Sequence, residues 1–283
     1  MSTMNQEKAC SADLVLEVCG LSAMNQEKTF KLTIQTTEPL RVGAKRDPLS
    51  GADNPVVRVG GGLAIPGSSL KGALRNQIES YLIDRFFKAD HWEAGKEEWK
   101  PCIPGAEVSA DERRLIREGK YRDQERTCHY PCEDRCRGTT HSICPVCYLL
   151  GAMTLPGFVR VPFLFAEGAS SELSGIRLDR ATKTVPQAGR GGSFRSYELV
   201  PQGTAFTGVM YVTVEDTVTG WALGQPRKLG ERATKGDKWL EGQPGDQSQF
   251  LSEFLIERLQ AIKTIGGFKS KGFGRIEITA VET

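Results

Sequence analysis

Residues 65–75 read IPGSSLKGALR and place a proline, a glycine and two serines directly before a helical pattern. Serine is favoured at the start of a helix, because its side-chain oxygen accepts a hydrogen bond from a backbone amide that has no partner in the helix. The apolar residues that recur at helical spacing are Leu70, Leu74, Ile78, Tyr81 and Leu82. The stretch predicts a helix that is capped by Ser68 or Ser69 and continues to about residue 87.

Alternation of apolar and polar residues predicts strands on both sides of this helix. Phe30, Leu32 and Ile34 alternate with polar neighbours upstream, whereas residues 158–165 (FVRVPFLF) are apolar on both faces. Pro162 indicates a bulge or an edge within the second of these strands. Further along the chain we expect a strand with its apolar face at Phe206, Met210, Val212 and Val214, a second amphipathic helix over residues 251–262, and a last strand over residues 276–280.

The predicted order is strand, helix, strand, strand, helix, strand, which is the ferredoxin-like order. We therefore expect an α+β fold with a ferredoxin-like (RRM-like) β-α-β-β-α-β domain. Such a unit needs far fewer residues than the chain has, so residues 1–283 are interpreted as one elaborated domain with long insertions. Residues 88–150 form a charged insertion that ends in cysteines, and residues 167–204 form a second, polar insertion.

The composition is that of an ordinary globular protein. Hydrophobic residues make up 39% and charged residues 25% of the chain, which excludes disorder and collagen-like repeats. No apolar run approaches the ~20 residues of a membrane-spanning helix, and no basic and apolar leader is visible at the N-terminus. We expect a cytoplasmic protein without a membrane partner.

The net charge is only +2, but basic residues gather in three glycine-rich segments, residues 41–75, 177–195 and 263–275. Backbone amides of such loops can approach a phosphate chain together with cationic side chains. The alternative is three solvated loops that never meet. If the segments form one groove for RNA, Lys71, Arg180 and Lys269 should lie on the same side of the molecule.

Five cysteines fall within twenty residues of the first insertion, and two of them form the C-x-x-C sequence Cys144-Pro-Val-Cys147. Spacing of this kind is typical of a structural zinc site with four ligands. We expect four of five candidates to bind Zn²⁺: Cys128, Cys132, Cys136, Cys144 and Cys147. Cys132 and Cys136 are preferred as partners of the C-x-x-C pair, Cys128 is the main substitute, and His129 and His141 are weaker options. A redox C-x-x-C is the alternative, while Cys10, Cys19 and Cys102 are interpreted as ordinary thiols.

Four segments resemble motifs of one known family, in the family's order. They are residues 51–58 (GADNPVVR) with 65–75, residues 144–152 (CPVCYLLGA), residues 175–184 (GIRLDRATKT) with 197–206 (YELVPQGTAF), and residues 265–275 (IGGFKSKGFGR). The family is the RAMP superfamily of CRISPR effector proteins. The match is best to the zinc-bearing form of the type III backbone subunit, the Cas-seven or Csm-three type, and it runs from about residue 28 to the end.

The resemblance implies a guide-RNA-binding backbone subunit that cleaves bound target RNA at regular intervals. It also implies that the 167–204 insertion is a thumb hairpin that crosses the guide–target duplex. By motif, Asp53 is the residue that cleaves, with Mg²⁺ or Mn²⁺ and the RNA 2′-hydroxyl as nucleophile. Asp53 could act as a general base or as a metal ligand, Lys45 and Arg46 could stabilise the charge that develops on phosphate, and Asp47 is a rival carboxylate.

The candidate RNA-binding residues combine charge, glycine and aromatic rings. A helix N-terminus favours a phosphate, Lys71 and Arg75 lie on one helix face, and phenylalanine rings can stack on bases. The candidates are Arg58, Gly67, Ser68, Ser69, Lys71, Arg75, Arg177, Arg180, Lys183, Arg190, Phe194, Lys269, Lys271, Phe273 and Arg275.

The expected partners are guide RNA, target RNA, further copies or homologues of the subunit, and other effector subunits. Two alternatives stay open. The chain could be a structural RNA-binding subunit that does not cleave, or a zinc-stabilised protein-interaction module without a role in RNA binding.

Overall fold

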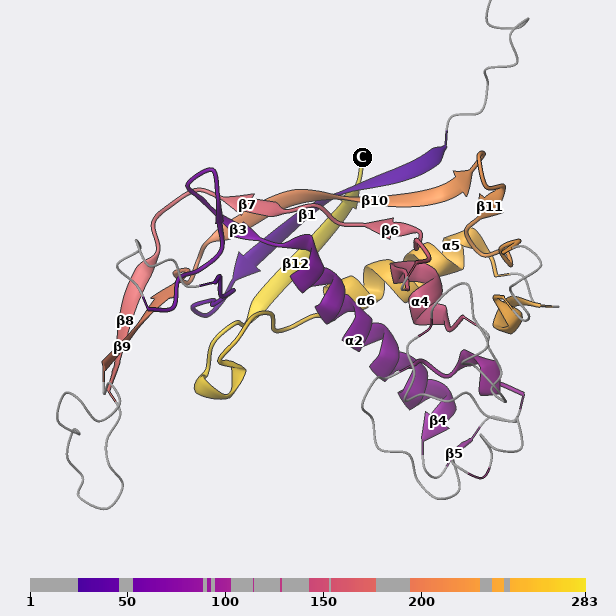
Figure 1. Ribbon diagram of the computed structural model, residues 1–283, viewed down its shortest axis with the longest axis horizontal. Coiled ribbons are helices and arrows are strands. Elements are labelled where there is room, and N and C mark those ends of the chain that lie inside the picture. The colour runs from indigo at the N-terminus through magenta and orange to yellow at the C-terminus, as the bar shows by residue number, and fades with distance from the viewer. Residues whose placement is uncertain are drawn as a thin grey trace, which may run out of the picture.

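The computed structural model describes residues 25–45, 53–88, 91–92, 95–102, 114, 128, 143–152, 154–176, 194–229, 236–241 and 245–283. An eight-stranded antiparallel sheet forms the centre of the molecule (Figure 1). Its order from edge to edge is β12 (Ile276–Glu282), β1 (Gln26–Thr36), β10 (Ala205–Asp216), β7 (Leu164–Ala166), β3 (Gly62–Ile65) and β2 (Arg58–Val59). Two short strands also pair with β10, namely β6 (Val159–Arg160) and β11 (Trp221–Ala222).

The sheet confirms the ferredoxin-like prediction. The four predicted strands correspond to β1, the pair β6 and β7, β10, and β12, and the first and third of them lie side by side in the middle of the sheet. Pro162 falls in the gap between β6 and β7, where the predicted interruption occurs. The apolar alternation also holds, since Leu32 and Ile34 of β1 and Met210 and Val212 of β10 are fully buried.

Helix α2 (Gly67–Phe86) is the predicted first helix, and Leu70, Leu74, Ile78, Leu82 and Phe86 form its buried face. The predicted serine cap is wrong. The helix starts at Gly67 after Pro66, and among the described residues no side chain caps it. A Cβ atom on Gly67 would lie 1.7 Å from the carbonyl oxygen of Val161. Close packing on the β6–β7 connection therefore fixes the start of this helix.

The second predicted helix begins earlier than expected and is irregular. It consists of α5 (Gln247–Gln249), a π-helical stretch (Phe250–Ile256) and α6 (Glu257–Gln260). Asp246 caps it by accepting a hydrogen bond from the amide of Ser248. This helix, α2 and the short helix α4 (Pro145–Leu150) all lie on the same side of the sheet (Figure 1). Their apolar residues belong to one continuous buried cluster with the inner face of the sheet.

The remaining described elements are short. They are β4 (Phe87–Lys88), β5 (His91–Trp92) and three 3₁₀ turns at Glu97–Trp99, Lys238–Leu240 and Lys269–Lys271.

Strands β8 (Ser171–Ile176) and β9 (Phe194–Leu199) pair antiparallel as a separate two-stranded sheet. They fall within the predicted thumb insertion and extend away from the main sheet at the left of Figure 1. The sequence predicts the tip of this hairpin at residues 186–195. Residues 177–193 lie outside the described part of the chain, whereas Phe194 and Arg195 belong to β9.

The face of the sheet opposite the helices carries two exposed aromatic side chains, Phe163 and Phe165, whose ring centroids are 6.3 Å apart. In the part of the chain that the structure describes, no helix has the length and apolar character needed to cross a membrane.

Candidate functional site

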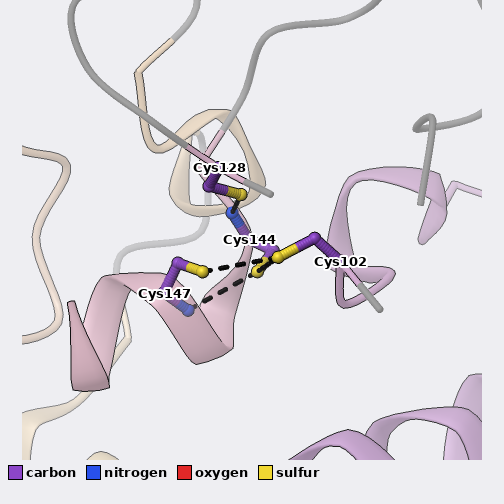
Figure 2. A group of neighbouring side chains, drawn as sticks. All are labelled: Cys102, Cys128, Cys144 and Cys147. Atoms are coloured by element: carbon purple, nitrogen blue, oxygen red, sulfur yellow. Dashed lines mark hydrogen bonds between the residues drawn. The ribbon is translucent and has the colours of Figure 1, made fainter. Parts of the chain in front are cut away.

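Four cysteines from three separate stretches of chain meet in the core beside α4. Cys144 precedes the helix, Cys147 lies in its first turn, Cys102 follows the 3₁₀ turn at Glu97–Trp99, and Cys128 completes the group (Figure 2). All four are buried, and their sulfur atoms lie within 4.8 Å of one another. The Sγ atom of Cys102 is 3.4 Å from that of Cys147 and 3.7 Å from that of Cys144.

These separations fit a tetrahedral metal ion. Zinc–sulfur bonds of ~2.3 Å in a tetrahedron put sulfur atoms about 3.8 Å apart. The 3.4 Å between Cys102 and Cys147 is too long for a disulfide, which needs ~2.0 Å. Two backbone amides already point at the sulfur atoms, since the amide of Cys144 donates to Cys128 and that of Cys147 donates to Cys144. The donor set and its hydrogen bonds could hold a metal such as zinc.

Hydrogen bonds and burial act together on the thiols of this group. Hydrogen bonding to Cys102 and burial raise the pKa of the thiols of Cys128 and Cys147. Buried thiols in this state stay protonated at neutral pH, and a bound cation would displace their protons, because the thiolate is the form that binds metal. Metal binding is therefore expected to weaken as the pH falls.

The group of four cysteines contains three of the five predicted ligands and one cysteine that was not predicted. Cys128, Cys144 and Cys147 were candidates, but Cys102 was interpreted as an ordinary thiol and is the fourth member of the group. Cys132 and Cys136, like His129 and His141, lie outside the described residues. Cys102 is far from the other cysteines in the sequence, and its one local signal is its place between two prolines, Pro101 and Pro104.

Two cations of α2 that were predicted to bind RNA are bonded within the protein instead. The Nζ atom of Lys71 donates to the carbonyl oxygen of Val159 at 3.1 Å. Burial and the neighbouring Arg75 lower the pKa of Lys71. Arg75 donates to the Sγ atom of Cys147 at 3.5 Å and to the carbonyl oxygen of Gly151 at 3.1 Å. Their contact with RNA stays a prediction.

A second candidate site forms where the loop before β2 meets the hairpin strand β9. The amide of Asp53 donates to the hydroxyl of Ser196 at 3.0 Å, and the amide of Ser196 donates back to the Asp53 carboxylate at 3.3 Å. Asn54 and Glu198 extend this contact, because the amide of Glu198 donates to the carbonyl oxygen of Asn54 at 3.0 Å. Hydrogen bonds of the backbone amides of Asp53, Ser196 and Glu198 therefore join the predicted catalytic loop to the hairpin.

Lys45 lies at the same end of this loop as Asp53. The amide of Ala44 donates to the carbonyl oxygen of Pro55, and Gly43 pairs antiparallel with Val56. In an antiparallel pair, the residue after Ala44 and the residues before Pro55 lie at one end. The fold therefore places Lys45 and Asp53 at the same end of this antiparallel pair, whereas Arg46 and Asp47 lie outside the described residues.

Glu198 holds the base of the hairpin against β2. Its carboxylate accepts hydrogen bonds from the amide of Val56, the hydroxyl of Ser170 and the guanidinium of Arg58, the last at 2.8 Å. Burial alone would raise the pKa of Glu198, but the bonds from Ser170, Arg58 and Val56 outweigh burial and lower it. Arg58, a predicted RNA contact, is therefore engaged in an ion pair that positions the hairpin.

A cluster of rings and cations joins the glycine-rich C-terminal loop to the rest of this site. The rings of Tyr197 in β9 and Phe268 in the loop meet edge to face, with centroids 5.0 Å apart. The guanidinium carbon of Arg41 lies 4.8 Å and the Nζ atom of Lys271 4.4 Å from the centroid of Phe268. We call Arg41, Tyr197, Phe268 and Lys271 the aromatic–cation cluster; sequence reasoning missed Arg41 and Tyr197 as site residues.

Backbone contacts hold this loop in place. The amide of Gly267 donates to the carbonyl oxygen of Arg41 at 2.8 Å, and a Cβ atom on Gly266 would lie 2.4 Å from the same oxygen. Phe268 adopts a left-handed backbone conformation with φ of 61°, which is uncommon for a residue other than glycine. The glycines of the predicted phosphate loop thus serve close packing of the loop on residues 39–41.

Apart from Arg58, Lys71 and Arg75, the predicted RNA-binding residues divide into three groups. Lys269, Lys271 and Arg275 are exposed and Phe273 is half-buried on or after the C-terminal loop. Gly67 is buried at the start of α2, where Ser68 is exposed and Ser69 half-buried. Phe194 is the first residue of β9, and the members outside the described residues are Arg177, Arg180, Lys183 and Arg190.

Segments of the three predicted basic regions, or residues next to them, do meet. Arg41 belongs to the first region, Tyr197 follows the second, and Phe268 and Lys271 belong to the third. Lys71, Arg180 and Lys269 are predicted to lie on one side of the molecule. Arg180 lies outside the described residues, so this stays a prediction.

Comparison with known proteins gives one family. The sequence model of the RAMP superfamily matches residues 33–277, which is most of the chain. No curated protein matches the chain.

Proposed function

The chain belongs to the RAMP superfamily, and from this membership we propose that it is the guide-RNA-binding backbone subunit of a type III CRISPR effector complex. The superfamily supports a CRISPR-associated role in RNA binding and assembly with other subunits. In the proposed complex, further copies or homologues of the chain lie side by side along one guide RNA, and target RNA pairs with that guide.

The aromatic–cation cluster carries the proposal, because two of the basic segments meet there with strand β9, which begins at the end of the other basic segment. Lys269 and Lys271 are exposed beside the rings of Tyr197 and Phe268, and exposed Arg195 lies on the same strand as Tyr197. Rings next to cations are the combination that binds single-stranded RNA, because the cations attract phosphates and the rings stack on bases.

We assign cleavage of target RNA to Asp53. Its carboxylate lies at the base of the hairpin that would cross the duplex, and its hydrogen bond to the amide of Ser196 orients it. In the proposed reaction the 2′-hydroxyl of the target attacks the neighbouring phosphate, and the bond to the 5′-oxygen breaks. Asp53 takes the proton of that hydroxyl or holds Mg²⁺ or Mn²⁺, and Lys45 and Arg46 stabilise the charge that forms on phosphate.

Target cleavage by the assembled complex tests this assignment. We expect Asp53→Ala and Asp53→Asn to abolish cleavage in the presence of Mg²⁺ while guide and target binding are kept. Glu277→Gln, an exposed carboxylate on β12, is the control and should cleave normally. Unchanged cleavage by both Asp53 variants would remove the catalytic assignment and leave the chain as an RNA-binding subunit that does not cleave.

We also propose that Cys102, Cys128, Cys144 and Cys147 bind one structural Zn²⁺. The four sulfur atoms are buried and close, and a donor set of four thiolates suits zinc. Such an ion would join three stretches of chain, so its binding energy would add to the stability of the folded state.

A further inference from the structure

Arg75 reaches from α2 to both ends of α4. Its Nη1 atom donates to the Sγ atom of Cys147 at 3.5 Å, and its Nη2 atom donates to the carbonyl oxygen of Gly151 at 3.1 Å. Cys147 lies in the first turn of α4, and Gly151 is the residue at which α4 ends. On its own helix, Arg75 also lies 3.8 Å from the carboxylate of Glu79. The guanidinium is therefore held on three sides by groups of the protein.

The hydrogen bond from Arg75 to the sulfur of Cys147 would matter most when a metal is bound. Four thiolates carry more negative charge than one divalent cation neutralises, so the metal–thiolate group is anionic and buried. Hydrogen bonds from outside the ligand shell reduce this excess charge and orient the ligands. Arg75 donates such a bond to sulfur from outside the group, and two further bonds to sulfur come from amides of the cysteines themselves.

We propose that Arg75 is a positioning residue of the metal centre, which donates a charge-assisted hydrogen bond to the metal-bound sulfur of Cys147, and that it is not an RNA contact. The inference rests on the metal site proposed above. A guanidinium keeps its positive charge in proteins, so the hydrogen bond that Arg75 donates to sulfur is charge-assisted. Through this bond the metal centre also fixes α2, the helix that carries Lys71.

Release of zinc to a chelator tests the inference on the full-length chain. The zinc-loaded wild type, Arg75→Gln and Arg75→Lys are mixed with a colorimetric chelator and the release rate is followed. Loss of an outer hydrogen bond to a metal ligand typically costs ~10–100-fold in metal affinity, and we expect Arg75→Gln to release zinc faster by a factor in that range. Arg75→Lys keeps the charge but cannot reach both Cys147 and Gly151, so it should lie between the two.

Lys71→Gln is the matched control, because Lys71 lies one turn away on the same helix and bonds to a carbonyl oxygen instead of sulfur. It should release zinc at the wild-type rate. The salt dependence of single-stranded RNA binding is measured on the same zinc-loaded proteins, and Arg75→Gln should keep the wild-type slope.

Three results would overturn the inference or its premise, and they are distinguishable. If the wild type carries no zinc, the proposed metal site itself is wrong. If the wild type carries zinc but Arg75→Gln and Arg75→Lys release it at the wild-type rate, the site stands and the role of Arg75 is wrong. A reduced salt slope of Arg75→Gln with normal zinc release would make Arg75 an RNA contact. If Arg75→Gln does not fold, Arg75→Lys decides.

Discussion

Cys102 shows how one residue can change the interpretation of a site. It lies with Cys128, Cys144 and Cys147 in the core, although it stands well before them in the sequence. Spacing rules find ligands that are close in sequence, and a ligand that tertiary packing brings in leaves no such pattern. The pair Cys144 and Cys147 was predictable because both side chains come from the start of one helix.

Replacement of Cys102 tests the ligand set. We expect Cys102→Ser to lose bound zinc in stoichiometric metal analysis of the purified protein, because a hydroxyl is a poor substitute for a thiolate ligand. Cys144→Ser should behave in the same way. Cys19→Ser serves as the control and should keep one zinc per chain. Full retention of zinc by Cys102→Ser, together with loss in Cys132→Ser, would return the site to the set that the sequence favours.

Arg227 and Asp237 form a fully buried ion pair with 2.8 Å between Nε of Arg227 and Oδ2 of Asp237. The Arg227 guanidinium also lies over the ring of Tyr148 in α4, 4.7 Å from its centroid. Asp237→Asn would leave a buried cation without its counter-charge, which typically costs about 3–5 kcal/mol of folding free energy. Urea denaturation of the wild type and of Asp237→Asn measures this loss of folding free energy.

A surface pair supplies the comparison for that experiment. Glu257 bonds to Arg258 on α6 and its side chain is 55% exposed, so Glu257→Gln should cost less than ~1 kcal/mol. Equal, small losses for Asp237→Asn and Glu257→Gln would show that the buried pair does not stabilise the fold.

At the scale of elements, the sequence predicts what depends on local periodicity. Apolar alternation identified β1, β10 and β12, and the four-residue spacing from Leu70 to Leu82 identified α2, because in each case one face packs on the core. The start of α2 was not predictable in the same way, since it depends on the carbonyl oxygen of Val161 far along the chain. The aromatic–cation cluster was missed for the same reason, as its members come from three distant segments.

The attachment of the hairpin is an element-scale property that Glu198 should control. Its carboxylate bonds to Val56, Ser170 and Arg58, and Glu198→Gln removes the charge from these bonds. We expect amide hydrogen exchange in β8 and β9 to become faster, with a loss of roughly 1 kcal/mol for a partly exposed charged network. Glu172→Gln is the control, because Glu172 lies opposite Glu198 in the hairpin and is exposed.

The pH dependence of this attachment has a defined sign. The pKa of Glu198 is lowered in the folded protein by its bonds to Ser170, Arg58 and Val56 in spite of burial. The folded state therefore binds fewer protons than the unfolded state, and the stabilisation is present above pH 4.5, the ordinary value. It is lost as the pH falls below that value. Protection of the hairpin amides, measured relative to an unfolded chain at the same pH, that stays unchanged on acidification of the wild type would contradict this role.

At the scale of the whole molecule, exposed cations at the aromatic–cation cluster should set the salt dependence of RNA binding. Each phosphate contact with a single strand contributes about −0.7 to the slope of log K against log salt concentration. Lys271→Gln should reduce the slope by roughly one such contact, because Lys271 is exposed at the aromatic–cation cluster. Lys28→Gln, which breaks an exposed pair with Glu282, should leave the slope unchanged. A flat salt dependence of the wild type would exclude phosphate contacts.

The central claim is that RNA binds at the aromatic–cation cluster, and ultraviolet cross-linking of the full-length chain to single-stranded RNA tests it most directly. Two aromatic surfaces differ in their surroundings. Tyr197 and Phe268 lie among cations, whereas Phe163 and Phe165 form an exposed pair on the open face of the sheet. Mass spectrometry of the cross-linked peptides should find nucleotide on those that contain Tyr197 or Phe268. Nucleotide found only on the peptide that contains Phe163 and Phe165 would place RNA on the sheet and contradict the account.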